Sequence, residues 1–526
     1  MKRVILLFIL VFAVNSFAAQ VVIREKKINI HILEDGRVVE HVYEKIDING
    51  FSGMRSAGEW FFTYNPKLTE VKILKSITHT EEGKAIPSPE NAILDFSPYS
   101  VENAPDFSYI REKIVSHTGL EPKSVIEFEY EVRDKIPHRF VYFLDLRDRF
   151  FVERVEVSVV DNGKCRTFSD HVDFDSKNFV FVAKNVKPVR TNLMGENYYA
   201  NTPYIAFVIN PVSNYLKEYL SHLSENGFNK VKDLMDIDGL DGRALCYAVF
   251  DFVNKKLNTV NLGASHTGYK CRDFYEIVKS GYATDFEKAV LAYWVLKNSG
   301  LKPSFLVKGF KVENSIVEID GYGIEVDGVK WPSGIDTKLP YYDLNGKKVK
   351  SPYLKASLIV KAEEEKDGFE GNFYFEGNDD INFSLPGLKK KSDNTVEKGD
   401  GKVVIEGTVS GKIEKILKMS NWIAGAIPAG QSDFTFYNFA DISYPIEISE
   451  LVVLTFEKPV KAVFHSREVK NSAGFSSVKY SVNGKTLKIE RRIKIVPGFY
   501  SGKKMKLLRD LIIPVSSESY NTVIFN

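Results

Sequence analysis

Residues 283–303 read ATDFEKAVLAYWVLKNSGLKP, and this stretch decides the fold of the central region. Thr284 and Glu287 have the spacing of a capping box, in which each side chain bonds the backbone N–H of the other residue. Asp285 takes the first helical position, where the helix dipole favours a carboxylate. The glycine after Ser299 suits a helix end. The sequence therefore predicts a helix from Asp285 to Ser299.

Further helices are expected before this one, and strands after it. A stripe of leucines follows a possible cap at Ser213, and apolar residues recur with helical spacing over 244–257 and 272–279. Three strand-like segments come next, at 304–312, 317–319 and 324–326. Residues 202–345 are therefore predicted to form an α+β domain.

The region before residue 202 reads as all β. Apolar residues alternate at Ile28, Ile30 and Ile32 and are followed by the turn signal Asp35-Gly36. This period of two is typical of a half-buried strand in a hairpin. Residues 20–201 are predicted to be an all-β domain.

The region after residue 350 also reads as β, with Asn483-Gly484 marking a tight hairpin. We predict an all-β region over 351–526, as one domain or two. Within it, the charged stretch 363–401 is predicted to hold a long exposed loop or a weakly ordered connection. The whole chain is thus expected to be a multidomain α+β protein.

The N-terminus has the features of a signal peptide. Met1-Lys2-Arg3 precedes an unbroken apolar run from Val4 to Val14, and small residues follow it. The expected peptide is 1–18, cut after Ala18, with Ala19 as the alternative. The run is shorter than the ~20 residues that span a bilayer. We therefore expect a periplasmic or secreted protein that keeps no membrane span after cleavage.

Charge and cysteine content narrow the possible partners. Lysine plus arginine (71) nearly balances aspartate plus glutamate (69), so no overall field would recruit nucleic acid. The three cysteines, Cys165, Cys246 and Cys271, have no metal-ligand spacing. At most one disulfide can form, and a bridge between Cys246 and Cys271 is left open. No motif predicts a metal or a cofactor.

Several separated motifs resemble the bacterial DUF3857 domain. They are the segment Ala104–Glu112, the segment Ser116–Pro122 with the alternating strand after it, and Trp60–Pro66 upstream. This resemblance implies a β-sandwich-like exported module of unassigned chemistry over residues 20–201. Such a module commonly precedes a transglutaminase-like domain.

Residues 283–303 look like the core helix of the transglutaminase-like (papain-like) superfamily, whose pattern is Gly-Asp-Cys-Lys-Asp-Lys-Ala followed by an apolar helix. Aligned without gaps, the nucleophile position falls on Asp285. A two-residue insertion that aligns Gly281 with the glycine of the motif moves it to Ala283. Neither register supplies a thiol, which as a thiolate would be the nucleophile of this family. Stabilisation of the helix start explains Asp285 better than a chemical role does.

The histidine of the family is also missing. No histidine occurs between His266 and His465, and the hairpin at 322–331 occupies the place of the strand that would carry it. Asp336 is a possible remnant of the third, acidic member. An acid without thiol or imidazole cannot activate a nucleophile.

Two enzyme hypotheses remain as alternatives. The first is an active cysteine peptidase or amide-transfer enzyme that uses Cys271 with His266. The second uses carboxylates such as Asp285 and Asp336, with a bell-shaped pH profile. Residues 272–281 resemble the short helix before the nucleophile loop, which places Cys271 on a different element from the family's nucleophile.

The preferred hypothesis is an exported, non-catalytic transglutaminase-like protein with a binding or assembly role in the cell envelope. Its compartment and family resemblance suggest a peptide, cell-wall or exopolysaccharide component as partner. Tyr282, Tyr322 and Trp331 are candidates for lining the cleft, although core packing explains each of them as well. The oligomeric state is left open.

Overall fold

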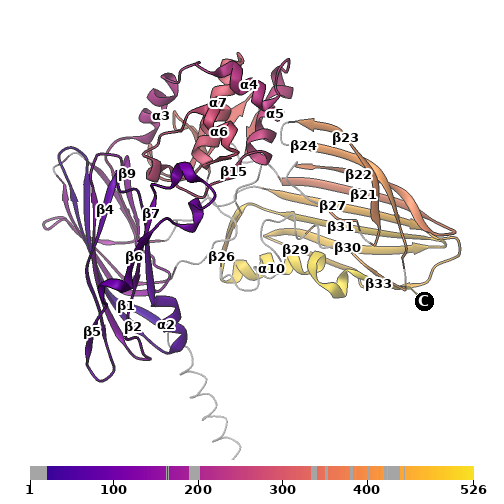
Figure 1. Ribbon diagram of the computed structural model, residues 1–526. Coiled ribbons are helices and arrows are strands. Elements are labelled where there is room, and N and C mark those ends of the chain that lie inside the picture. Colours follow the sequence, from indigo (N-terminus) through magenta and orange to yellow (C-terminus); the bar gives the residue numbers. More distant parts are fainter. Residues whose placement is uncertain are drawn as a thin grey trace, which may run out of the picture.

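The computed structural model is β-rich and multidomain, with three large hydrophobic cores that follow one another along the sequence (Figure 1). It describes residues 20–161, 163, 165–188, 202–332, 340–349, 354–378, 383–385, 387–399, 402–413, 415–419, 423, 439–442 and 445–525. The predicted signal peptide lies outside these residues. Within them, no helix is both long and apolar enough to cross a membrane. We call the three parts the N-terminal, central and C-terminal modules.

The N-terminal module packs one long sheet against two short ones, and it also contains the short helix α2 (Phe51–Ala57). The long sheet has the order β12-β13-β10-β1-β2-β8-β4-β5, with bounds β1 Val21–Ile32, β2 Val38–Ile48, β4 Thr69–His79, β5 Ala85–Pro87, β8 Val125–Asp134, β10 Phe151–Asp161, β12 Asp173–Asp175 and β13 Val180–Val186. The short sheets are β11 (Arg166–Asp170), β14 (Tyr204–Val208) and β9 (Val141–Asp145), and β3 (Glu59–Tyr64), β7 (Arg111–Ser116) and β6 (Ile93–Phe96).

The predicted alternation in the first strand is confirmed. Ile28, Ile30 and Ile32 are 4%, 1% and 2% exposed and face the core. β1 pairs antiparallel with β2 and parallel with β10, so it lies inside the long sheet. Three 3₁₀ turns connect the strands, at Glu90–Ala92, at Tyr99–Val101 and, as η4, at Pro105–Phe107.

The central module places helices before a small sheet, as predicted. The helices are α3 (Val212–Ser221), α4 (Phe228–Met235), α5 (Gly242–Lys255), α6 (Phe274–Ser280) and α7 (Asp285–Asn298). The sheet has the order β19-β18-β17-β20, with bounds β17 Ser304–Val312, β18 Ser315–Val326, β19 Val329–Trp331 and β20 Tyr341–Asp343. The two-residue strands β15 (Asn258–Thr259) and β16 (Tyr282–Ala283) pair in parallel, and the 3₁₀ turn η5 covers Ala264–Thr267.

The predicted helix over 285–299 is confirmed to within one residue. Both bonds of the capping box are present: Glu287 N donates to Thr284 Oγ1 (3.2 Å), and Thr284 N donates to Glu287 Oε2 (3.1 Å). α7 is buried along most of its length and packs against β18. Helix α4 was not predicted from the sequence.

The C-terminal module is built on a second long sheet, of order β23-β24-β22-β21-β27-β31-β30-β29. Its strands are β21 Leu354–Glu365, β22 Gly368–Asn378, β23 Lys389–Gly399, β24 Lys402–Gly411, β27 Ile446–Thr455, β29 Arg467–Asn471, β30 Gly474–Asn483 and β31 Thr486–Ile495. The smaller sheets are β25 (Ile416–Lys418) with β33 (Thr522–Phe525) and β28 (Ala462–Val463), and β26 (Phe439–Ile442) with β32 (Gly498–Ser501).

Two predictions for this module are wrong. It is not all β, because the helix α10 (Lys503–Ser516) packs Met505, Leu508 and Leu511 onto one face of the sheet, before the 3₁₀ turn η6 (Glu518–Tyr520). The stretch 363–401 is not a loop, because most of its described residues belong to β21, β22 and β23. The predicted Asn483-Gly484 hairpin between β30 and β31 is confirmed.

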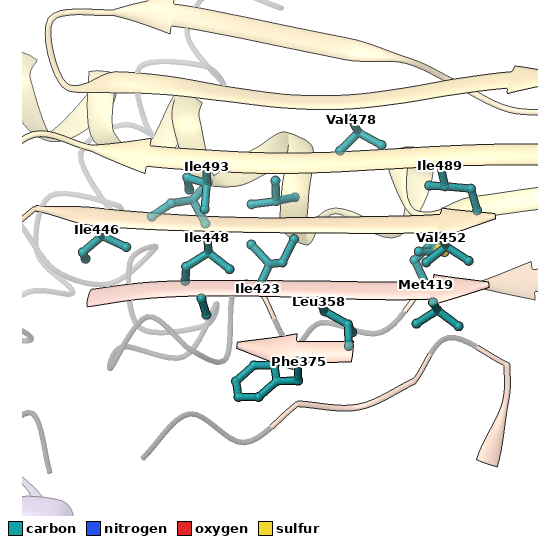
Figure 2. Packing of buried hydrophobic residues seen from close by; sticks show 14 of the residues in the cluster. Leu358, Phe375, Met419, Ile423, Ile446, Ile448, Val452, Val478, Ile489 and Ile493 are labelled. Atoms are coloured by element: carbon teal, nitrogen blue, oxygen red, sulfur yellow. The ribbon is translucent and has the colours of Figure 1, made fainter. Parts of the chain in front are cut away.

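One face of the C-terminal sheet forms the core of the module. Leu358, Val452 and Ile489 lie on the neighbouring strands β21, β27 and β31, and all are fully buried (Figure 2). Because successive side chains of a strand point to opposite faces, the residues between them lie on the other face of the sheet. We call this second face the outer face.

Candidate functional site

The resemblance of residues 283–303 to the transglutaminase-like superfamily predicts a nucleophile position at the start of α7. Asp285 is exposed there, in the first turn of the helix. Ala283, the other candidate, is fully buried in β16. The capping box occupies the adjoining backbone N–H groups, and both Thr284 and Glu287 are buried. Of the two candidates, only Asp285 is accessible.

Aromatic rings surround the beginning of this helix. Tyr322 of β18 packs edge-on against Phe286, with ring centroids 5.0 Å apart. Tyr269 and Tyr219 approach the same phenylalanine at 6.1 and 6.2 Å. Burial raises the pKa of Tyr322 well above its ordinary value. Tyr322 thus stands opposite the helix start as a neutral phenol, which cannot accept a proton as an imidazole would.

Cys271 lies close to this aromatic cluster, just before α6. Its backbone N–H donates to the Tyr219 hydroxyl at 3.1 Å. Burial raises the pKa of the Cys271 thiol, and the negative charge of Glu287 raises it further. A reactive cysteine needs the opposite shift, because the thiolate is the nucleophile. Cys165, Cys246 and Cys271 are all free thiols, so Cys246 and Cys271 are not bridged.

His266, the proposed partner of Cys271, instead contacts the N-terminal module. Its Nε2 lies 3.2 Å from the Thr63 carbonyl oxygen at the end of β3, and Asn65 Nδ2 donates to the His266 carbonyl at 2.8 Å. Its Nδ1 is buried and has no hydrogen-bond partner among the described residues. Burial lowers the pKa of the imidazole. Among the described residues, neither ring nitrogen of His266 has a hydrogen bond to Cys271.

Arg272 is the residue that sequence reasoning missed. Its guanidinium holds Glu287 with two hydrogen bonds, Nε to Oε1 at 2.9 Å and Nη2 to Oε2 at 3.0 Å. It also pairs with Asp106 of the N-terminal module and donates to the Tyr282 carbonyl at 2.7 Å. The ring of Phe107 lies 4.7 Å from its Cζ. One arginine thus joins the capping box of α7 to η4.

Tyr282 belongs to the same junction. Its hydroxyl donates to Asp106 Oδ2 at 2.7 Å, and this bond, with help from Arg272, lowers the pKa of Asp106. A small apolar cluster surrounds the contact and draws residues from both modules: Val101, Ala104, Phe107, Ile110, Val260, Leu262 and Tyr282. Tyr282 is therefore placed between two modules, and Asp106, from the motif that resembles DUF3857, is its partner. We call this set of contacts the Arg272 junction.

The other candidates are dispersed or outside the described residues. Trp331 is 5% exposed and donates from Nε1 to Asn254 Oδ1 at 2.8 Å, which places it against α5. Asp336 lies outside the described residues, so its relation to Asp285 stays a prediction. In the part of the chain that the structure describes, no group of three or more His, Cys, Asp or Glu side chains could hold a metal ion.

Comparisons with known proteins agree with part of this picture. The family model of DUF3857, a domain of unknown function with a solved structure, matches residues 34–198. No curated protein matches the chain. Among solved structures, a suspected protease from Parabacteroides distasonis has a TM-score of 0.71 at 16% identity, covering 97% of this chain and 100% of that one. At this identity the likeness concerns the fold alone.

Two further solved structures are much less similar. Native yeast LTA4 hydrolase has a TM-score of 0.21 at 7% identity, covering 41% of this chain and 35% of that one. The same enzyme in complex with bestatin has a TM-score of 0.21 at 9% identity, covering 36% and 28%. Scores this low carry no argument about fold or function.

Proposed function

We propose that the chain is an exported, non-catalytic relative of transglutaminase-like proteins with a binding or assembly role in the bacterial cell envelope. The observation that supports the proposal is the pair of side chains near the start of α7. The exposed carboxylate of Asp285 occupies the position that the sequence resemblance assigns to a thiol, and the phenol of Tyr322 packs on the neighbouring Phe286, where the family would need a base.

The chemistry of Cys271 and Tyr322 supports a catalytically silent site. Acyl transfer by a cysteine requires a thiolate with a base that takes its proton. Burial keeps Cys271 protonated, and it gives Tyr322 too high a pKa to ionise near neutral pH. The rings of Tyr219, Tyr269 and Tyr322 pack around Phe286 at the same place. The fold would then serve recognition.

The export part of the proposal rests on the N-terminal sequence. A basic start, a short apolar run and small residues before Ala19 are typical of a cleaved leader. A periplasmic or secreted location would bring the mature chain into contact with peptide, cell-wall and exopolysaccharide material. Mass spectrometry of the protein recovered from the periplasm tests this, with a mature N-terminus at Ala19 as the expected result.

Thiol labelling tests the central claim. The purified chain is treated with a fluorescent iodoacetamide at pH 7, beside Cys271→Ser and His266→Ala variants. We expect slow labelling of Cys271 that does not change in His266→Ala, because the thiol is protonated and the imidazole bonds Thr63. Rapid labelling that His266→Ala abolishes would overturn the proposal.

An active cysteine peptidase or amide-transfer enzyme using Cys271 with His266 is the second candidate. It is favoured by the closeness of Cys271 to the start of α7 and by the overall likeness to a suspected protease. Peptide hydrolysis that is lost in Cys271→Ser would establish it. A carboxylate enzyme would lose activity in Asp285→Asn instead, so the same assay separates all three hypotheses.

A further inference from the structure

The outer face of the C-terminal sheet is hollowed into a groove. Two adjoining hollows of about 1020 and 600 Å³ share Lys361, Asn372 and Thr408 in their walls. These residues belong to β21, β22 and β24, which lie side by side in the sheet (Figure 1). We call the joined hollows the outer groove.

The groove is separate from the core of its module. Leu358 and Val360 of β21 are fully buried on the core face, whereas Ile359 is half-buried and Lys361 is exposed on the outer face. α10 packs on the core face, as shown by its buried side chains. The outer-face side chains of the groove, such as Lys361, are therefore not needed to fill the core.

Two rows of side chains cross the groove from strand to strand. The register places Ser392, Thr408, Asn372 and Lys361 next to one another on β23, β24, β22 and β21. The neighbouring row consists of Asn394, Glu406, Tyr374 and Ile359. The hydroxyls of Ser392 and Thr408 are 2.7 Å apart. Each row offers hydroxyl, amide or charged groups on several strands in succession.

The composition of the rows is unusual for strand positions. Asparagine is depleted in strands, where β-branched and aromatic residues are preferred. Asn372 and Asn394 nevertheless occupy neighbouring rows, and Asn372 lies within β22 on the exposed face. Amide side chains there add no core packing, but they donate and accept hydrogen bonds at once. This property suits a ligand rich in hydroxyl groups.

The spacing of the rows selects between two kinds of polymer. Neighbouring strands are about 4.8 Å apart, which is close to the length of one pyranose unit. Each sugar of a polysaccharide laid across the strands would therefore meet a side chain of the next strand. An extended peptide advances only about 3.3 Å per residue, so its side chains would fall out of step with the rows. A linear polysaccharide matches the crossing direction better.

The lining offers contacts for both the apolar C–H groups and the hydroxyl groups of a sugar. The Tyr374 ring is half-buried, and its hydroxyl donates to Glu376 Oε2 at 3.1 Å, which fixes the ring on the face. Val396 is 60% exposed at the edge of the groove and adds an apolar surface. C–H faces of sugar rings pack on such surfaces, while their hydroxyls reach the amides and carboxylates beside them.

Charge argues against an anionic polymer. The lining carries more glutamates than lysines: Lys361, Lys391, Glu363, Glu365, Glu370 and Glu406. Lys391 is paired with Glu370 at 3.1 Å. A groove without excess positive charge has no field to attract polyanions. The ligand expected from this balance is neutral.

From these observations we infer that the outer groove binds a linear, neutral polysaccharide of hexopyranose units, laid across β23, β24, β22 and β21. This inference goes beyond the proposed function and does not depend on the central module. Failure of sugar binding would leave the thiol-labelling result unchanged, so the two tests are distinguishable.

Affinity electrophoresis of the full chain, with calorimetry as a second measurement, tests the inference. The probes are hydroxyethylcellulose in the gel, and cellohexaose, laminarihexaose and maltohexaose in the calorimeter. We expect retardation in the gel and measurable binding of at least one hexasaccharide. Tyr374→Ala should weaken binding about fivefold, because a ring contact contributes on the order of 1 kcal/mol. The double variant Tyr374→Ala, Asn372→Ala should bind more weakly than Tyr374→Ala alone.

A matched control lies on the same outer face but outside the groove. Ser481 of β30 is exposed, and Ser481→Ala should bind as the natural chain does. Equal binding by Tyr374→Ala and the natural chain would overturn the inference. So would the absence of binding to every neutral probe, or binding only to polygalacturonate or polylysine.

Discussion

Two arginines, Arg272 and Arg491, each hold a carboxylate that is almost fully buried, but they connect different levels of the structure. Arg272 holds Glu287 and reaches across to Asp106 of the N-terminal module. Arg491 pairs with Glu450 on the neighbouring strand, and its Nη1 donates to Asn521 Oδ1 at 2.8 Å.

The difference lies in what each set of contacts joins. Asp106 and Arg272 belong to different modules, and an apolar cluster with residues from both modules surrounds them, so their ion pair fixes one module against the other. Asn521 donates to the carbonyls of Pro514 and Ser517, so the Arg491 contacts tie the end of α10 to its own sheet. The same residue type therefore orients two modules in one place and closes a single core in the other.

The largest effect is expected from Arg491→Met. The substitution leaves the Glu450 carboxylate in the core without its arginine, and breaking a buried pair typically costs about 3–5 kcal/mol of unfolding free energy. Hydrogen exchange in β27 and β31 and the midpoint of thermal unfolding measure the loss. Arg492→Met, on the exposed face of the same strand, is the control. Recovery in an Arg491→Met, Glu450→Leu double variant would show that the uncompensated charge is the cause.

A smaller effect is expected from Arg272→Met, about 2 kcal/mol, because the arginine side chain is 16% exposed and water screens part of the loss. Faster hydrogen exchange should appear in segments 99–110 and 282–290, on the two sides of the Arg272 junction. β27 and β31 should stay protected. Lys270→Met, at an exposed position nearby, is the control. Equal loosening of the C-terminal strands would contradict the distinction between the two arginines.

A second contact between the N-terminal and central modules, at Glu318, is expected to make the free energy of unfolding depend on pH. Glu318 of β18 has its pKa raised to about 8, by burial first and then by Asp145 of β9 and by Asp320. Between about pH 4.5 and 8 the folded chain holds a proton that the unfolded chain releases, so stability falls as pH rises through this window.

Thermal unfolding from pH 5 to 8 measures this dependence. The chain should unfold at a lower temperature at pH 8 than at pH 5, and Glu318→Gln should flatten the profile because it cannot ionise. Glu313→Gln, at an exposed position nearby, should keep the natural profile. A pH profile identical in Glu318→Gln and the natural chain would remove Glu318 as the source.

The smallest effect is expected from Asp285→Asn. The carboxylate lies in the first turn of α7 and is exposed, so its interaction with the helix dipole contributes only about 0.3–1 kcal/mol. The capping box through Thr284 and Glu287 stays intact. Thermal unfolding of the purified variant measures the change. A loss well above 1 kcal/mol would indicate contacts of Asp285 beyond helix capping.

Elements with a strong local signal could be predicted from the sequence. The capping box at Thr284 and Glu287 fixed the start of α7, because both of its bonds form within one turn of the helix. The alternation at Ile28, Ile30 and Ile32 predicted a strand with one buried face. Gly484 predicted a hairpin because a tight turn there requires a positive φ, which is 59° in the structure.

Elements whose residues conflict with local rules were not predicted. β23 carries Lys389-Lys390-Lys391 and polar residues that read as loop, yet it pairs along β24 as an edge strand. Charge on an edge strand prevents further pairing with other chains, which explains why such residues occur there. Helix α10 contains Pro514, which reads as a helix breaker, but its apolar stripe packs on the sheet and outweighs that penalty.

The sequence by itself determined the order of the modules, the N-terminal motif that resembles DUF3857 and the carboxylate at the start of α7. Tertiary structure alone decided that Arg272 meets Asp106 and that Asn372 and Tyr374 line one groove. The physical reason is the distance along the chain between the residues that interact. Caps, turns and alternation act between near neighbours in the chain, whereas these contacts join residues that become neighbours only when strands pair and modules dock.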